Sequence, residues 1–198
     1  MSTGSGSKAP ISPAEFTAVL DQHQEALYRF LWGLVSDVEQ ARDLLQDTFH
    51  DAWRLARRSE PPFLANGSRD EMRYWLFRVA YHRAISALRR RRLIRWESLE
   101  ERQEREPEAF SAALTFEYDI AEREALRAAL ERLAPQDVAC LFLRLVQGFS
   151  PGEIGQIVGA SSGQISKRLS RAKQRLRSAY LAQEGQPEHT ASQKGAPS

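Results

Sequence analysis

The sequence contains little that would support covalent or metal chemistry. It has one cysteine, Cys140, which lies among apolar residues and has no second thiol for an internal disulfide, so we expect it to be a buried small side chain. The four histidines lack metal-ligand spacing, and we find neither a glycine-rich phosphate loop nor a nucleophile with its base. We therefore expect no metal, no cofactor and no enzymatic activity.

Long apolar segments are also missing. No run of about 18 apolar residues could span a membrane, and residues 1–10 lack the apolar stretch of a signal peptide. Hydrophobic residues make up 42% of the chain and charged residues 27%, which suits a soluble protein with a real core. Strand-like alternation is absent, and the patterned stretches have helical period. We expect an all-α cytoplasmic protein without membrane insertion.

The net charge of +2 conceals a strong segregation of charge along the chain. Residues 73–95 contain eight arginines and no acid, and residues 167–177 contain six bases and no acid. Between these blocks, residues 97–124 hold ten acids against three arginines, a net charge of −7. This pattern indicates two polyanion-binding surfaces and an anionic spacer, although three ordinary solvated faces would have the same charges.

The apolar periodicity predicts two small helical domains joined by an acidic linker. In the first, we expect a helix from about Pro13 to Val35, a second from a capping box at 36–39 to near Arg58, and a third from a capping box at 68–71 into the arginine block. The expected boundaries are a disordered N-terminus at 1–13, a first domain at 14–92, the linker at 93–118, a second domain at 119–181 and a disordered tail at 182–198.

The sharpest local pattern is a helix-turn-helix at the end of the second domain. Ser150, Pro151 and Glu153 form a capping box with proline at the first helical position. Gly159 supplies the positive φ of a tight helix end, and residues 161–164 form a second capping box. Two helices joined by so short a turn predict a helix-turn-helix.

The second of these helices has the composition of a DNA-recognition helix. At about 100° per residue, Ile165, Leu169, Ala172 and Leu176 share one face, which we expect to be buried. An ordinary amphipathic surface helix would mix in acids, but none occurs from Gln164 to Leu181. We predict base contacts on the outward face and phosphate contacts on its flanks. The predicted DNA-binding set is Gln164, Ser166, Lys167, Arg168, Ser170, Arg171 and Lys173.

Two segments of the first domain also suggest binding surfaces. The segment from Arg73 interleaves cations with aromatics, as in proteins that hold unpaired strands, although Trp75 and Phe77 are better read as core and the arginine run could be a solvated helix end. The helix at 41–53 has an acidic face that would repel DNA and should meet protein. Its large apolar residues, Phe49 and Trp53, could equally pack the domain core.

With these residues in hand, the chain resembles the extracytoplasmic-function (ECF) sigma factors of bacterial RNA polymerase. Residues 43–53, DLLQDTFHDAW, resemble the family's polymerase-binding motif, and residues 74–86, YWLFRVAYHRAIS, resemble its segment for opening and reading the −10 element. LERLAP at 130–135 and GQISKRLSRAKQRLR at 163–177 resemble its −35-binding domain.

The resemblance implies a sigma factor that binds promoter DNA and the two largest subunits of core RNA polymerase. It also implies an anti-sigma factor that holds the chain inactive. The acidic linker would thread the RNA path near the polymerase active site. The implied polymerase contacts are Asp43, Leu44, Gln46, Asp47, Phe49 and Trp53. The implied −10 contacts are Arg73, Arg78, Tyr81, His82, Arg83, Ser86, Arg89 and Arg90.

Two departures from the family pattern stand out. His82 replaces a common asparagine, and Gln136 with Asp137 replaces a usual basic pair after the proline. The base preference at His82 is therefore open. An alternative reading is a stand-alone regulator that binds duplex DNA through residues 150–181 and uses the first domain as a sensor or dimeriser. Specific duplex binding without polymerase would distinguish this alternative.

Overall fold

The computed structural model describes residues 12–57, 69–97 and 120–184, and within these ranges every regular element is an α-helix. The all-α prediction is confirmed. The expected N-terminal disorder, most of the acidic linker and the tail beyond residue 184 lie outside the described residues. The helices are α1 (Pro13–Val35), α2 (Val38–Ala56), α3 (Arg69–Glu97), α5 (Ile120–Glu131), α6 (Pro135–Leu145), α7 (Pro151–Val158) and α8 (Ser162–Glu184).

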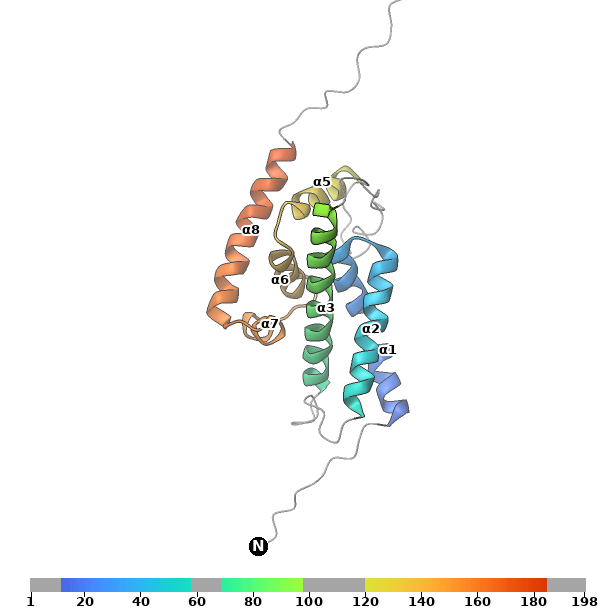
Figure 1. Cartoon of the computed structure of the whole chain (residues 1–198). Coiled ribbons are helices and arrows are strands. Elements are labelled where there is room, and N and C mark those ends of the chain that lie inside the picture. The colour runs from blue at the N-terminus through green and yellow to red at the C-terminus, as the bar shows by residue number, and fades with distance from the viewer. Residues whose placement is uncertain (1–11, 58–68, 98–119, 185–198) are drawn as a thin grey trace, which may run out of the picture.

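Helices α1, α2 and α3 form one lobe, which we call the first lobe. Its core is built from the apolar stripe of α1 and the inward face of α3, and Phe30 meets Phe77 edge to face with ring centroids 5.4 Å apart. Phe77 is fully buried, as expected, whereas Trp75 is only half-buried. Figure 1 shows α3 running through the middle of the molecule, beside α1 and α2.

Helices α5 to α8 form the second lobe. Helix α8 lies on the outside of the molecule and packs against α5, α6 and α7 (Figure 1). The predicted buried face of α8 is confirmed, since Ile165, Leu169 and Ala172 are buried and Leu176 is half-buried. Burial of this single stripe leaves the rest of α8 facing solvent.

The helix ends largely follow the predicted local chemistry. Ser150 and Glu153 form the expected capping box, and Gly159 ends α7 with φ of 76°. Ser161 and Gln164 form reciprocal bonds at the start of α8: the Gln164 amide donates to Ser161 Oγ at 3.3 Å, and the Ser161 amide donates to Gln164 Oε1 at 2.9 Å. The predicted capping boxes at Ser150 and Ser161 are confirmed, and with them the helix-turn-helix.

The capping box predicted at residues 36–39 is wrong. Asp37 is the cap of α2, and its side chain accepts from the Gln40 amide at 2.9 Å. Ser36 has φ of 52° and makes the turn that precedes the cap. The cap is one residue later than predicted because both residues are good caps and only the turn geometry decides between them. Helix α2 ends at Ala56, close to the predicted end near Arg58, and α3 and α8 continue to Glu97 and Glu184. Ser68, the cap proposed for α3, lies outside the described residues.

The two lobes are docked against each other. Helix α6 packs on α1, and both α6 and α7 pack on α3, so the buried apolar residues of the two lobes form one continuous cluster. The lobes approach closely at Gly33 of α1, where an added Cβ would overlap the ring of Phe142 on α6. Nothing in the sequence analysis predicted this docking.

Candidate nucleic-acid interfaces

Helix α8 presents the predicted DNA-binding residues to solvent. Six of the seven are exposed, and Arg168 is half-buried. The exposed six are Gln164, Ser166, Lys167, Ser170, Arg171 and Lys173. The turn before α8 is tightly built, because an added Cβ at Gly155 of α7 would overlap the backbone carbonyl of Ala160. A glycine at this position lets α7 and α8 approach closely enough to form the turn.

A buried carboxylate fixes α8 on its flank. Asp137, in the first turn of α6, is 8% exposed and accepts from Arg175 Nη1 at 2.9 Å. Arg168 Nε lies 3.6 Å from the other oxygen of the same carboxylate. These residues line an open groove together with Gln164, Lys167 and Arg171. One acid therefore holds two cations of α8 and orients the helix against α6.

Removing the Asp137 carboxylate is expected to destabilise the second lobe. Asp137→Ala leaves Arg168 and Arg175 without their acid, and because both arginines are partly exposed we expect a loss of about 1–2 kcal/mol of unfolding free energy. Equilibrium unfolding in urea measures this loss of unfolding free energy. Glu124→Gln removes the same charge from an exposed position on α5 and should change stability little. An equal loss in both variants would show that net charge, and not this contact, is responsible.

The predicted −10 residues of α3 fall into two groups. Those with exposed side chains are Arg78, His82, Ser86, Arg89 and Arg90. Tyr81 is 6% exposed, and burial raises the pKa of its hydroxyl, with Cys140 and Arg168 of the second lobe close enough to influence it. Arg73 and Arg83 are half-buried. Part of the candidate DNA face is therefore covered by the second lobe.

Polar and aromatic contacts hold the second lobe against this region of α3. Arg73 Nη2 donates to the Gln147 carbonyl at 2.6 Å, and its guanidinium lies 4.1 Å from the ring centroid of Phe149. The Tyr74 hydroxyl donates to Glu153, the residue that also closes the capping box of α7. These bonds lower the pKa of the Glu153 carboxyl. These contacts between the lobes involve Arg73, Tyr74, Gln147, Phe149 and Glu153.

Acidification is expected to weaken the folded state through two histidines. Burial lowers the pKa of His23, and the nearby Arg73 lowers it further. Partial desolvation of the His82 ring and the nearby Arg78 lower the pKa of His82. Because the folded state favours neutral histidine, this stability is present above the ordinary pKa of 6.5 and is lost as the pH falls below it. Chemical unfolding should give a lower free energy of unfolding at pH 5.5 than at pH 7.5, and His23→Gln should reduce this difference. The same decline in His23→Gln would exclude His23 as a cause.

The predicted polymerase face of α2 is partly accessible. Asp43, Gln46 and Asp47 are exposed, whereas Leu44 is buried in the core. Phe49 and Trp53 are half-buried and pack against the core, and Trp53 meets Phe16 with ring centroids 5.1 Å apart. Both aromatics therefore pack the domain core and stay partly accessible, and their contact with polymerase remains a prediction.

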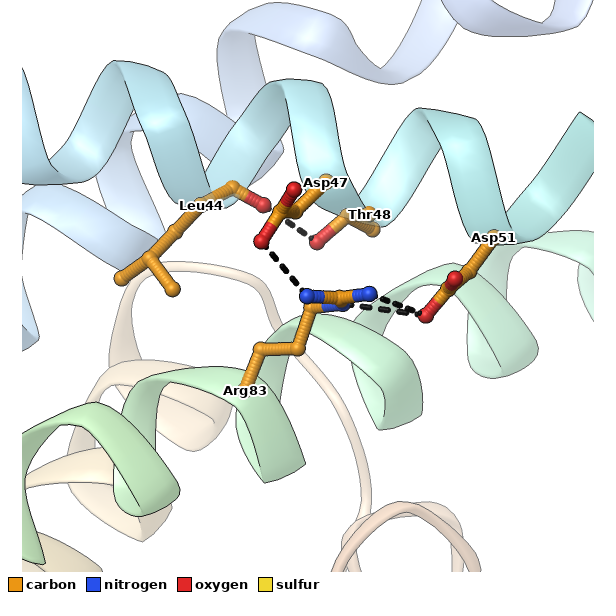
Figure 2. A network of polar contacts seen from close by, with 5 residues as sticks. All are labelled: Leu44, Asp47, Thr48, Asp51 and Arg83. Atoms are coloured by element: carbon orange, nitrogen blue, oxygen red, sulfur yellow. Dashed lines mark hydrogen bonds and ion pairs between the residues drawn. The ribbon is translucent and has the colours of Figure 1, made fainter.

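Two ion pairs join α2 to α3 (Figure 2). Arg83 Nη1 donates to Asp47 Oδ2 at 2.6 Å, and its Nε and Nη2 donate to Asp51 Oδ2 at 3.0 and 2.6 Å. Arg83 was predicted to contact DNA, and neither Asp51 nor the role of Asp137 was predicted. Charge alone could not identify them, because their partners lie more than 30 residues away along the chain.

Two kinds of feature are absent from the part of the chain that the structure covers: metal-holding clusters and membrane-spanning helices. Within the described ranges, no group of histidine, cysteine or acidic side chains is placed to hold a metal ion. No described helix is both long and apolar enough to cross a membrane.

Both lobes match known families of sequences. Residues 19–94 match "Sigma-70 region 2", and residues 123–176 match "Sigma-70, region 4". The chain is 31% identical over 162 residues to the RNA polymerase sigma factor CarQ of Myxococcus xanthus, covering 82% of this chain and 87% of CarQ. It is 31% identical over 161 residues to the ECF sigma factor SigE of Mycolicibacterium smegmatis, covering 81% of this chain and 59% of SigE.

Solved structures share the fold. The sigma factor RpoE, solved with the anti-sigma factor NepR from Bartonella quintana, matches with a TM-score of 0.64 and 24% identity, covering 84% of this chain and 97% of RpoE. CnrH, solved with the cytosolic domain of CnrY, matches with a TM-score of 0.59 and 20% identity, covering 88% of this chain and 92% of CnrH. The chain therefore belongs to the ECF RNA polymerase sigma factors, with region 2 in its first lobe, a region 4 helix-turn-helix in its second, and promoter recognition in transcription initiation as its function.

Proposed function

We propose that this sigma factor binds core polymerase and the two promoter elements through three separate helical faces. Helix α2 binds core polymerase through the exposed side chains of Asp43, Gln46 and Asp47. Helix α3 holds the −10 region through its exposed cations and His82, and helix α8 binds the −35 element. The observation that carries the assignment is the outward face of α8, which is polar and basic and has no acid between residues 164 and 181. This helix follows a turn with capping boxes at Ser150 and Ser161.

The division of α8 into base and phosphate contacts follows from the angular position of each residue around the helix, at about 100° per residue. Ser166, Ser170 and Arg171 lie on the face opposite the buried stripe and suit hydrogen bonding to base edges. Lys173 lies on the flank, where a cation meets phosphate. Arg168 is turned toward Asp137, which supports a mainly structural role for it.

Charge reversal at Arg171 tests this division. With purified core polymerase, Arg171→Glu is expected to reduce transcription from promoters that need their −35 element by about tenfold or more, since a base contact of this kind is worth about 1–3 kcal/mol. Templates that do not depend on a −35 element should be affected much less. Arg132→Glu, an exposed reversal elsewhere in the second lobe, is the control. Equal loss on all templates would make Arg171 a phosphate contact.

The docked arrangement must open for promoter binding. Arg73 and Tyr81 can reach DNA only after the second lobe leaves α3, because both are covered by it. We propose that core polymerase, acting in the cytoplasm, stabilises the separated lobes.

NepR is bound to RpoE in its solved complex, and a comparable anti-sigma partner would hold this chain away from polymerase. Competition between such a partner and core polymerase for the purified chain tests this proposal.

A further inference from the structure

Among the α3 arginines whose side chains the structure describes, Arg83 makes the most hydrogen bonds to other side chains. Three of its N–H groups donate to two carboxylates of α2, over distances from 2.6 to 3.0 Å, and its side chain is 30% exposed. Figure 2 shows the guanidinium lying flat between Asp47 and Asp51, on the side of α3 that faces α2. An arginine has five N–H donors, so most of its bonding capacity is already used.

This placement disfavours a DNA contact by Arg83. Two acids offset its single positive charge, so a phosphate approaching this point would meet a net negative group. Arg78, Arg89 and Arg90 of the same helix are exposed, and among the described residues none of the three has an ion pair like those of Arg83. These three cations are therefore better placed than Arg83 to reach DNA.

We propose that Arg83 is a positioning residue of the polymerase-binding face, which holds the Asp47 carboxylate ready for polymerase. This inference rests on the proposed role of α2. Arg83 bonds only Oδ2 of Asp47, and the side chain of Asp47 stays 57% exposed, so Oδ1 is open to a donor on a partner. Holding the side chain in one rotamer reduces the entropy that binding would otherwise remove.

Asp47 and Asp51 also need a cation between them. They lie four residues apart on α2, where like charges repel each other, and Arg83 bridges the pair. Thr48, on the next position, donates its hydroxyl to the Leu44 carbonyl at 2.7 Å and lies fully buried, which keeps this turn of α2 against the core (Figure 2). Loss of Arg83 would therefore disturb the acid pair while leaving the helix packed.

Equilibrium binding of the full-length chain to core polymerase tests the inference. Arg83→Gln is expected to weaken this binding about fivefold, as for a partly exposed pair worth about 1 kcal/mol. At saturating Arg83→Gln, promoter opening and its salt dependence should match those of the unmodified chain. Arg78→Gln, on the same helix, should show the reverse split: unchanged polymerase binding and weaker promoter opening.

The combination with Asp47 separates a positioning role from an independent one. If Arg83 acts through Asp47, Asp47→Asn with Arg83→Gln should bind polymerase no more weakly than Asp47→Asn alone. Additive losses would overturn the inference, as would unchanged polymerase binding by Arg83→Gln beside a clear loss in Asp47→Asn. If neither single variant alters polymerase binding, the inference falls together with the proposed role of α2.

Discussion

Gly33→Ala is expected to separate the two lobes while leaving each of them folded. The new methyl group would overlap the ring of Phe142, which lies against Gly33 where α6 packs on α1. Phe142 is buried, so its ring cannot move aside without disturbing its own core, and overpacking of this kind costs about 1–3 kcal/mol. Within α1 itself, alanine favours the helix over glycine by about 1 kcal/mol.

Small-angle X-ray scattering of the free chain measures the separation. The radius of gyration should increase in Gly33→Ala, while the helical content measured by circular dichroism should stay constant. Phe142→Leu in the same chain makes room beside the new methyl group and should restore part of the compact form. A scattering curve identical to that of the unmodified chain would show that the ring adapts and that the docking is not as tight as the structure indicates.

Gly155→Ala is expected to weaken −35 recognition strongly through the turn between α7 and α8. Its added Cβ would overlap the Ala160 carbonyl, which is backbone and cannot swing away as a side chain could. We expect the second lobe to lose about 2–3 kcal/mol of stability and transcription from −35-dependent promoters to fall by tenfold or more.

Gly163→Ala is the matched control for this prediction. It makes the same substitution eight residues later, in the first turn of α8, where an added Cβ meets nothing within 4 Å. Helix propensity then favours alanine, so stability should be unchanged or slightly higher. Parallel thermal unfolding of the two variants decides the matter. Equal stability would mean that the turn between α7 and α8 can widen at little cost.

Local chemistry was predictable from the sequence. The caps at Ser150 and Ser161, the glycine that ends α7 and the buried stripe of α8 all depend on residues within a few positions of one another, and the structure confirms them. The cap of α2 was misplaced by one residue because Ser36 and Asp37 are both good caps.

Contacts between distant segments were not predictable. Arg73, Arg83 and Arg168 look like three equivalent cations in the sequence, yet one lies on Phe149, one bridges two acids of α2 and one lies beside Asp137. Glu153 was recognised as part of a cap but also accepts from Tyr74 of the other lobe. Such pairings depend on how the helices pack in three dimensions, which periodicity within one helix does not specify.

Transcription in vitro with purified core polymerase tests the central claim most directly. The chain should bind core polymerase at moderate salt and direct it to defined start sites on genomic fragments, and core polymerase alone should give none of these starts. The account would be contradicted if the chain failed to associate with core polymerase and instead bound specific duplex sites by itself.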